Sequence, residues 1–200
     1  ICCGGTQKAI SAPVGLAIVS VSADAQKAMD NRKTPIASFY ANLQVFKGYA
    51  EKEYLPYTTS AGDVAALDAA LDNILEEGIE TVFARHDRIA SAVRGSAQAY
   101  GLELFLDSDR SNTVTAIRIP EEIGALRLQD HLSENYNLLV ATSLAQYADV
   151  ILRIGHMGEN AFIDKLIYVL SIIDNGLRDL GFAGNGDLAQ LFIDIYKENN

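Results

Sequence analysis

Apolar residues recur every three or four positions along most of the chain, a spacing typical of helices that bury one face. The clearest case is the segment 160–180, which is closed by Gly181. The same spacing predicts helices over 23–31, 36–52, 63–77, 82–100, 121–132 and 188–196. Asp63 is expected to cap the helix over 63–77, because a carboxylate can accept a hydrogen bond from an unpaired N–H of the first turn.

Shorter apolar runs predict strands. Residues 16–21 read Leu-Ala-Ile-Val-Ser-Val, which favours a strand covered on both faces. An apolar stub at 1–3 could be the end of another buried strand. Further strands are expected at 103–106, 113–119, 138–141 and 149–154. Short strands mixed with helices after Gly101 indicate an α+β arrangement, and Pro56 makes 54–60 a loop.

Composition narrows the class of protein. With 49% hydrophobic and 21% charged residues, the 200-residue chain should fold around one large or two small cores. The net charge of -10 disfavours nucleic acid and anionic membranes as partners, because both are bound by clustered Lys and Arg. No apolar run approaches the roughly 20 residues needed to cross a bilayer, and no signal peptide is evident. We therefore expect a cytoplasmic protein.

The cysteines and histidines predict no metal site. Cys2 and Cys3 are adjacent, a poor arrangement for a disulfide or a metal motif, and they are interpreted as small strand residues. His86, His131 and His156 are scattered. Arg85 and His86 lie on one predicted helix. Such a pair more often has a packing or helix-capping role than a catalytic one, so we expect a structural role.

The stretch from Gly4 to Gly15 contains the best candidate for chemistry. Its glycines let the backbone pass close to a ligand, Thr6 and Gln7 offer neutral hydrogen-bonding groups, and Lys8 carries an amine. A lysine amine that can lose its proton attacks carbonyl carbons. A surface lysine at the end of a strand is the alternative.

This stretch resembles the lysine loop of class V pyridoxal-phosphate-dependent aminotransferases, in the alanine–glyoxylate and serine–pyruvate branch. The matching residues are the triplet 6–8, Thr-Gln-Lys, and the turn 12–15, Ala-Pro-Val-Gly, with Val14 where the family more often has a second proline. The resemblance implies an α/β protein, the C-terminal half of a fold-type I transferase. Residues 1–77 would then complete the large cofactor-binding domain, and 78–200 would form a small α+β domain. About half of the parent enzyme is expected upstream, so this chain alone should be an incomplete, inactive fragment.

The resemblance also implies roles for particular residues. Lys8 would hold pyridoxal phosphate as a Schiff base and act as general base, and Gln7 would donate to the cofactor phosphate. Thr58 matches a threonine that reaches the phosphate held by the other subunit of a homodimer. Tyr57 would assist it, although the spacing leaves Tyr54 as an alternative.

Arg153 lies inside an otherwise apolar predicted strand, which is costly unless its guanidinium is paired or faces a cleft. Its forked donors suit a carboxylate, and the run 152–155, Leu-Arg-Ile-Gly, looks like the substrate-binding arginine of the family. An edge-strand arginine that points into water is the alternative.

The function expected from these residues is transfer of an amino group from a small amino acid, alanine or serine, to glyoxylate or pyruvate. Aminoethylphosphonate transamination and a cysteine desulfurase-like reaction are alternatives, although Cys2 and Cys3 are misplaced for the latter. A non-catalytic fragment that acts through dimer contacts is the alternative from another class of protein.

Overall fold

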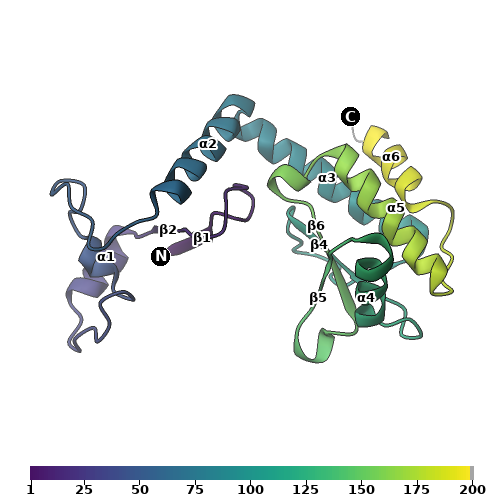
Figure 1. Ribbon diagram of the computed structural model, residues 1–200, viewed down its shortest axis with the longest axis horizontal. Coiled ribbons are helices and arrows are strands. Elements are labelled where there is room, and N and C mark those ends of the chain that lie inside the picture. Colours follow the sequence, from purple (N-terminus) through teal and green to yellow (C-terminus); the bar gives the residue numbers. More distant parts are fainter. Residues whose placement is uncertain (199–200) are drawn as a thin grey trace. The chain divides into compact units, whose positions relative to one another are not determined.

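The computed structural model describes residues 1–198, and the chain separates into two compact units, one spanning Ile1–Asn73 and one starting at Ile74 (Figure 1). The sequence predicted a cofactor-binding domain up to residue 77 and a small domain after it, and these two roles stay predictions. No helix in the described part of the chain is long and apolar enough to cross a membrane.

The first unit begins with a two-stranded antiparallel sheet made of β1 (Cys2–Gly5) and β2 (Ala17–Ser20). Helix α1 (Ala23–Asp30) follows, and Ser22 caps it by accepting a 3.2 Å hydrogen bond from the backbone of Ala25. The prediction that β2 is covered on both faces is wrong, because all four of its residues are exposed. Within residues 1–198 the strand pairs with β1 alone, so its apolar run has no second layer to pack against.

The predicted helix over 36–52 is also wrong. Only a 3₁₀ turn, η1 (Leu43–Phe46), forms there. Asn42 has an extended backbone, and its side chain accepts a 3.0 Å hydrogen bond from Gln44, which starts the turn at this point. Gly48 adopts φ +69°, which prevents helical continuation.

Two long helices follow, α2 (Ala61–Glu77) and α3 (Ile79–Tyr100), with Gly78 between them. The predicted capping role of Asp63 is wrong. Ser60 precedes α2, and its hydroxyl accepts a 3.3 Å hydrogen bond from the Asp63 amide. The helix therefore begins about one turn earlier than expected, and Asp63 lies within its first turn.

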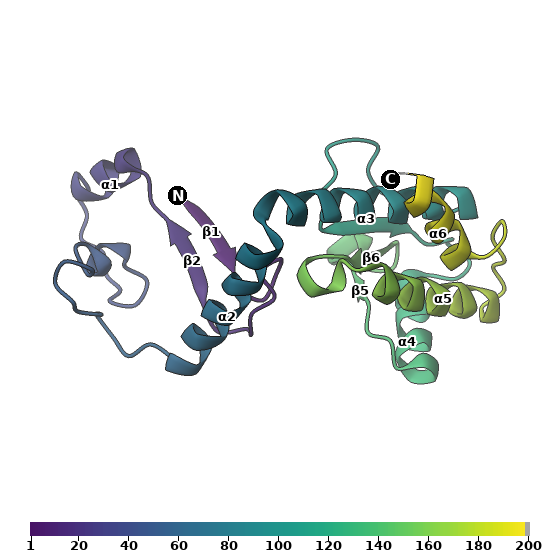
Figure 2. The ribbon, with the colours of Figure 1, turned by 90° about the horizontal axis from the view of Figure 1, so that it is seen from above.

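The second unit has a four-stranded antiparallel sheet with the strand order β3-β4-β6-β5. Figure 2 labels two of its strands, β5 and β6. Its strands are β3 (Glu103–Leu104), β4 (Val114–Arg118), β5 (Ala141–Thr142) and β6 (Ile151–Gly155). Its remaining helices are α4 (Ala125–Tyr136), α5 (Ile163–Asp179) and α6 (Leu188–Glu198). Short 3₁₀ turns, η2 (Ala145–Tyr147) and η3 (Gly158–Asn160), flank β6.

One face of this sheet faces the hydrophobic core of the unit. Ile117, Leu152 and Ile154 point to that face and pack in one cluster with apolar residues of α3, α4, α5 and α6. The residues between them in sequence point the other way, because side chains alternate along a strand. We call this opposite surface the open face, and it carries Ala116, Arg118 and Arg153, which are half-buried or exposed.

Candidate functional site

The loop between β1 and β2 is closed at its base by Thr6, which is fully buried. The Thr6 hydroxyl lies 3.0 Å from the carbonyl oxygen of Pro13 and 3.2 Å from that of Leu16. The Thr6 amide also donates to the Leu16 carbonyl at 3.3 Å, and the Ala12 amide donates to the Thr6 carbonyl at 3.1 Å. These contacts hold the two ends of the loop together, so the backbone position of the residues between them is restricted.

Lys8 and Gln7 project from this loop, and both side chains are exposed. A turn holds the lysine, whose amide donates to Gly5 at 3.3 Å and whose carbonyl accepts from Ser11 at 2.9 Å. The Gln7 side chain folds back over Gly5, where an added Cβ would lie 2.7 Å from Oε1 of Gln7. The Gln7 side chain is therefore placed against the backbone of β1, and the Lys8 side chain is open to solvent.

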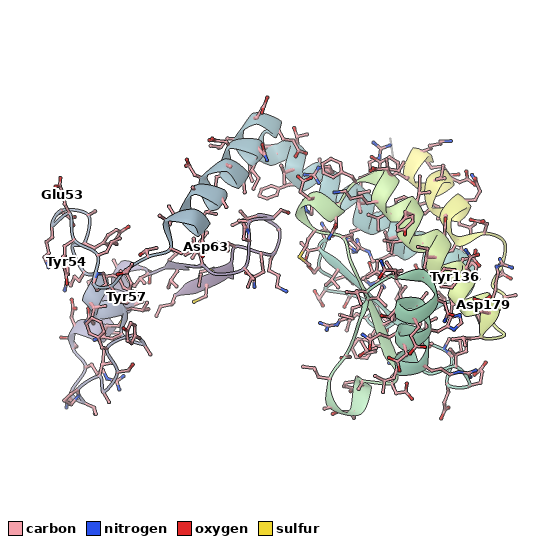
Figure 3. The ribbon with its side chains drawn as sticks, in the orientation of Figure 1. Glu53, Tyr54, Tyr57, Asp63, Tyr136 and Asp179 are labelled. Atoms are coloured by element: carbon pink, nitrogen blue, oxygen red, sulfur yellow. The ribbon has the colours of Figure 1, made fainter. Side chains whose placement is uncertain are left out.

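The far side of the loop approaches helix α2. A Cβ added to Gly15 would lie 2.6 Å from the carboxylate of Asp63, which is labelled in Figure 3. A larger residue at the end of the Ala-Pro-Val-Gly turn would therefore have to displace that side chain.

Tyr57 belongs to an aromatic cluster in the same unit (Figure 3). Its ring centroid lies 5.2 Å from that of Tyr40, 5.4 Å from that of Phe46 and 6.2 Å from that of Phe39. Thr58 is exposed directly beside it. Tyr54, the alternative candidate, is 64% exposed, and its ring makes no aromatic contact in the part of the chain that is described. Tyr57 is therefore the better anchored of the two tyrosines.

Arg153 lies at the middle of β6, which has a neighbouring strand on each side, so it is not on an edge strand. Ala116 of β4 and Ala141 of β5 lie directly opposite it in the ladder. Its side chain is exposed on the open face, and its Nε donates a 2.9 Å hydrogen bond to the carbonyl of Thr142. Among residues 1–198 the two terminal nitrogens have no polar partner, so they can donate to a ligand.

Arg85 and His86 act structurally, as the sequence suggested. Arg85 forms a bidentate pair with Glu77, at 2.6 and 2.8 Å, and donates to the carbonyls of Gly158 and Ala161. His86 Nε2 accepts a 2.9 Å hydrogen bond from the Gly158 amide, so its other ring nitrogen, Nδ1, is the one that donates to the Val82 carbonyl. Together they hold the turn that follows β6 against α3.

The predicted site residues divide between the two units. Lys8, Gln7, Tyr57 and Thr58 belong to the first, and Arg153 belongs to the second. No group of three or more His, Cys, Asp or Glu side chains that could hold a metal ion occurs in residues 1–198. The thiols of Cys2 and Cys3 are free and exposed on β1.

No family profile matches the sequence. The chain is 40% identical over 184 residues to an uncharacterised aminotransferase of Methanocaldococcus jannaschii, and the match covers 91% of this chain and 47% of that protein. It is 41% identical over 156 residues to the L-aspartate–glyoxylate aminotransferase of Paracoccus denitrificans, covering 77% and 39%. Identity to the serine–glyoxylate aminotransferase of Arabidopsis thaliana is 36% over 180 residues, covering 89% and 44%. The chain is homologous to the class V aminotransferases.

Solved structures agree with this relationship. The ureidoglycine–glyoxylate aminotransferase of Bacillus subtilis superposes with a TM-score of 0.89 at 30% identity, covering 98% of this chain and 51% of that one. The pyridoxamine–pyruvate aminotransferase of Mesorhizobium loti gives the same TM-score at 28% identity, with the same coverage. The chain thus has the fold of about half of a fold-type I aminotransferase, and it spans about half the length of the curated relatives it matches.

The sequence offered Thr6 as a neutral hydrogen-bonding group beside a ligand, but its hydroxyl is buried and bonded to carbonyls of its own loop. Thr142 was not singled out from the sequence, and it orients Arg153 through its backbone carbonyl. A backbone acceptor carries no side-chain signal, so only the strand pairing reveals this role.

Proposed function

We propose that the protein is a pyridoxal-phosphate-dependent aminotransferase that transfers an amino group from a small amino acid to glyoxylate or pyruvate. The observation that carries this proposal is the similarity to aminotransferases along about nine tenths of the chain. The named relatives share an oxo-acid acceptor, glyoxylate or pyruvate, whereas their amino donors include serine, aspartate and pyridoxamine. The acceptor is therefore better supported than the donor, for which alanine and serine are our first choices.

The residues of the lysine loop fit this cofactor. The Lys8 amine is exposed and has no carboxylate partner in residues 1–198, so it is available to a carbonyl. A Cβ added to Gly4 would meet nothing within 4 Å, which leaves room for a ligand beside the loop. When bound, pyridoxal phosphate supplies an aldehyde carbon and a ring that accepts the electron pair released from the substrate. Nζ of Lys8 would hold the aldehyde and, once released, move a proton from the substrate carbon.

The other site residues would bind and orient. The Gln7 amide would donate to the cofactor phosphate, and the Thr58 hydroxyl, with Tyr57 beside it, would donate to the phosphate held by the other subunit of a homodimer. The terminal nitrogens of Arg153 would hold the substrate carboxylate at two points, a geometry that suits a planar guanidinium. Because the Arg153 Nε already donates to Thr142, the carboxylate would bind at the end of the fork.

Borohydride reduction of the complete protein with pyridoxal phosphate tests this proposal. We expect the cofactor to be fixed by the reduction on the peptide that contains Lys8, because that amine alone would be joined to the aldehyde. Lys8→Arg should abolish both the labelling and transamination, and Lys27→Arg, which changes an exposed lysine of α1, should affect neither. Labelling of another lysine, or of none, would refute the assignment.

A further inference from the structure

Burial in the first unit is concentrated at the base of the lysine loop, residues 6–16 between β1 and β2. Within residues 1–73 the buried side chains are those of Thr6 and Ala12. The two residues are joined across the loop, because the Ala12 amide donates to the Thr6 carbonyl at 3.1 Å. A hydroxyl is costly to bury unless it is hydrogen-bonded. Valine has nearly the same shape and no hydroxyl, so packing alone does not require a threonine here.

The Thr6 hydroxyl has one proton and two neighbouring carbonyl groups. It lies 3.0 Å from the carbonyl oxygen of Pro13 and 3.2 Å from that of Leu16. The Leu16 carbonyl already accepts the Thr6 amide at 3.3 Å, whereas the Pro13 carbonyl has no other donor among residues 1–198. We therefore place the hydroxyl proton on the Pro13 side, where the bond links the start of the loop to the turn 12–15.

Lys8 lies between these two linked segments. Its amide donates to the Gly5 carbonyl at 3.3 Å, and its carbonyl accepts from the Ser11 amide at 2.9 Å. Ser11 has a φ of +62°, a left-handed conformation that costs a non-glycine residue about 1–3 kcal/mol and persists where surrounding contacts impose it. The bond from Ala12, the next residue, to Thr6 is such a contact. The base of the loop thus helps to maintain the turn from which the Lys8 side chain projects.

The reaction that we propose requires an accurately placed Lys8. Its Nζ would have to reach the aldehyde carbon of the cofactor to hold it, and the substrate carbon to move a proton. Misplacing a catalytic group by about 1 Å can lower the rate by about a hundredfold. The Lys8 side chain is exposed and is not held by an ion pair in the described chain, so its position depends on the loop backbone.

From these contacts we infer that Thr6 is a positioning residue, whose hydroxyl acts through the Pro13 carbonyl and the loop backbone on the amine of Lys8. Thr6 contacts neither cofactor nor substrate in this role, since its side chain is fully buried and bonded to loop carbonyls. The inference rests on the proposed function for the chemistry of Lys8. It replaces the role beside a ligand that the sequence suggested for this hydroxyl with a role inside the loop.

Two substitutions in the complete, cofactor-loaded protein separate the hydroxyl of Thr6 from its methyl group. Thr6→Val keeps the shape and removes the donor, so kcat should fall by about tenfold or more while KM for the amino acid stays within about twofold. KM should stay because the substrate carboxylate would be bound by Arg153 and not by the lysine loop. Thr6→Ser keeps the donor and should retain kcat within about threefold. Thr34→Val, at an exposed position of the same unit, should change neither constant.

Two further measurements on the complete protein, freed of cofactor, need no turnover. After pyridoxal phosphate is added, borohydride should fix it on the Lys8 peptide about tenfold or more slowly in Thr6→Val than in wild type or Thr6→Ser. Hydrogen exchange of the Ser11 and Ala12 amides should be faster in Thr6→Val, and exchange of the α1 amides should be unchanged. Equal acceleration throughout the first unit would assign the effect to general stability and overturn the inference.

The remaining outcomes also decide the matter. Wild-type kcat and labelling rate in Thr6→Val, or a larger loss in Thr6→Ser than in Thr6→Val, would overturn the inference. If Thr6→Val does not fold, Thr6→Ala takes its place with the same expected losses, because it leaves room for a water molecule at the Pro13 carbonyl. A wild-type protein that is not labelled on Lys8 would refute the proposed function and the inference with it. Labelled wild type with no effect of the Thr6 variants would refute the inference alone.

Discussion

His156 is fully buried directly after β6, and its Nε2 lies 2.8 Å from the hydroxyl of Thr115. Burial lowers the pKa of His156 from 6.5 to about 4, because the charged ring would lose its hydration, and the positive charge of Arg94 acts in the same direction. The native state therefore requires this histidine to be neutral.

We expect this requirement to make stability depend on pH. Between pH 6.5 and 4 the unfolded chain binds a proton that the folded chain does not, so stability falls as the pH is lowered through this window. The full loss is about 3 kcal/mol, at about 1.4 kcal/mol for each pKa unit. Urea unfolding of wild type and His156→Gln should show a stability difference that depends on pH between 4 and 6.5. The difference should be constant from pH 7 to 8, and a constant difference at all pH values would contradict the prediction.

At the scale of single elements, one buried carboxylate connects three helices. Asp174 of α5 accepts a 2.7 Å hydrogen bond from the hydroxyl of Tyr100 of α3 and a 2.9 Å bond from the Leu188 amide that begins α6. Arg178, one turn later on α5, pairs with the same carboxylate. Burial alone would raise the pKa of Asp174, but these donors together hold it below its ordinary value. Burial and the bond to Asp174 raise the pKa of Tyr100 to about 12.

Replacing Asp174 should therefore destabilise the second unit. Asp174→Ala leaves the Leu188 amide and the Tyr100 hydroxyl without their acceptor and Arg178 without its partner, and the expected cost is about 3 kcal/mol. Urea unfolding followed by circular dichroism measures it. Asp130→Ala, at an exposed position of α4, should change stability by less than about 0.5 kcal/mol. Similar values for the two variants would contradict the proposed importance of this network.

The elements that sequence patterns predicted best are those whose apolar residues fill the core. The segment 160–180 became α5, and its Leu166, Ile173 and Leu177 are buried as its period indicated. The helix expected at 121–132 begins only at Ala125, because Gly124 has φ +78° and the residues before it form a turn. The helix prediction for 36–52 was wrong because aromatic residues of this segment pack on Tyr57 from a loop. Tyr57 lies outside the segment, so the pattern within 36–52 does not reveal this contact.

The sequence pattern predicted the surroundings of the candidate site residues less well than it predicted the helices and strands. Residue type, spacing and the family resemblance made the lysine loop and the strand arginine candidates. The residues that surround Arg153 could not be predicted in this way, because they depend on the register between β4 and β6, which are separated by a helix and a further strand. A strand register becomes readable only when the sheet is known.

At the scale of the whole molecule, the two units differ in how much of each is buried. In the first unit only Thr6 and Ala12 are buried, and large apolar side chains such as Tyr40 and Val19 remain exposed. The second unit has a continuous core of strand and helix residues. Fixing each residue costs about 1–2 kcal/mol of backbone entropy, which is offset mainly by apolar burial. In this 200-residue chain, the first unit therefore buries too little apolar surface to offset the entropy cost of ordering its backbone.

We expect hydrogen exchange of the 200-residue chain to show this difference directly. Amides of β4, β6 and the centre of α3 should exchange only through global unfolding, whereas those of β1, β2 and α1 should exchange nearly as fast as in an unstructured peptide. Mass spectrometry of peptides after timed labelling measures both groups, and a sample unfolded in urea supplies the reference rates. Protection of the β1–β2 amides equal to that of β4–β6 would show that the first unit is stable without a buried core. If the complete protein is the aminotransferase that we propose, amides of the lysine loop should exchange more slowly in its cofactor-loaded form. The bound cofactor would cover this loop and so stabilise it.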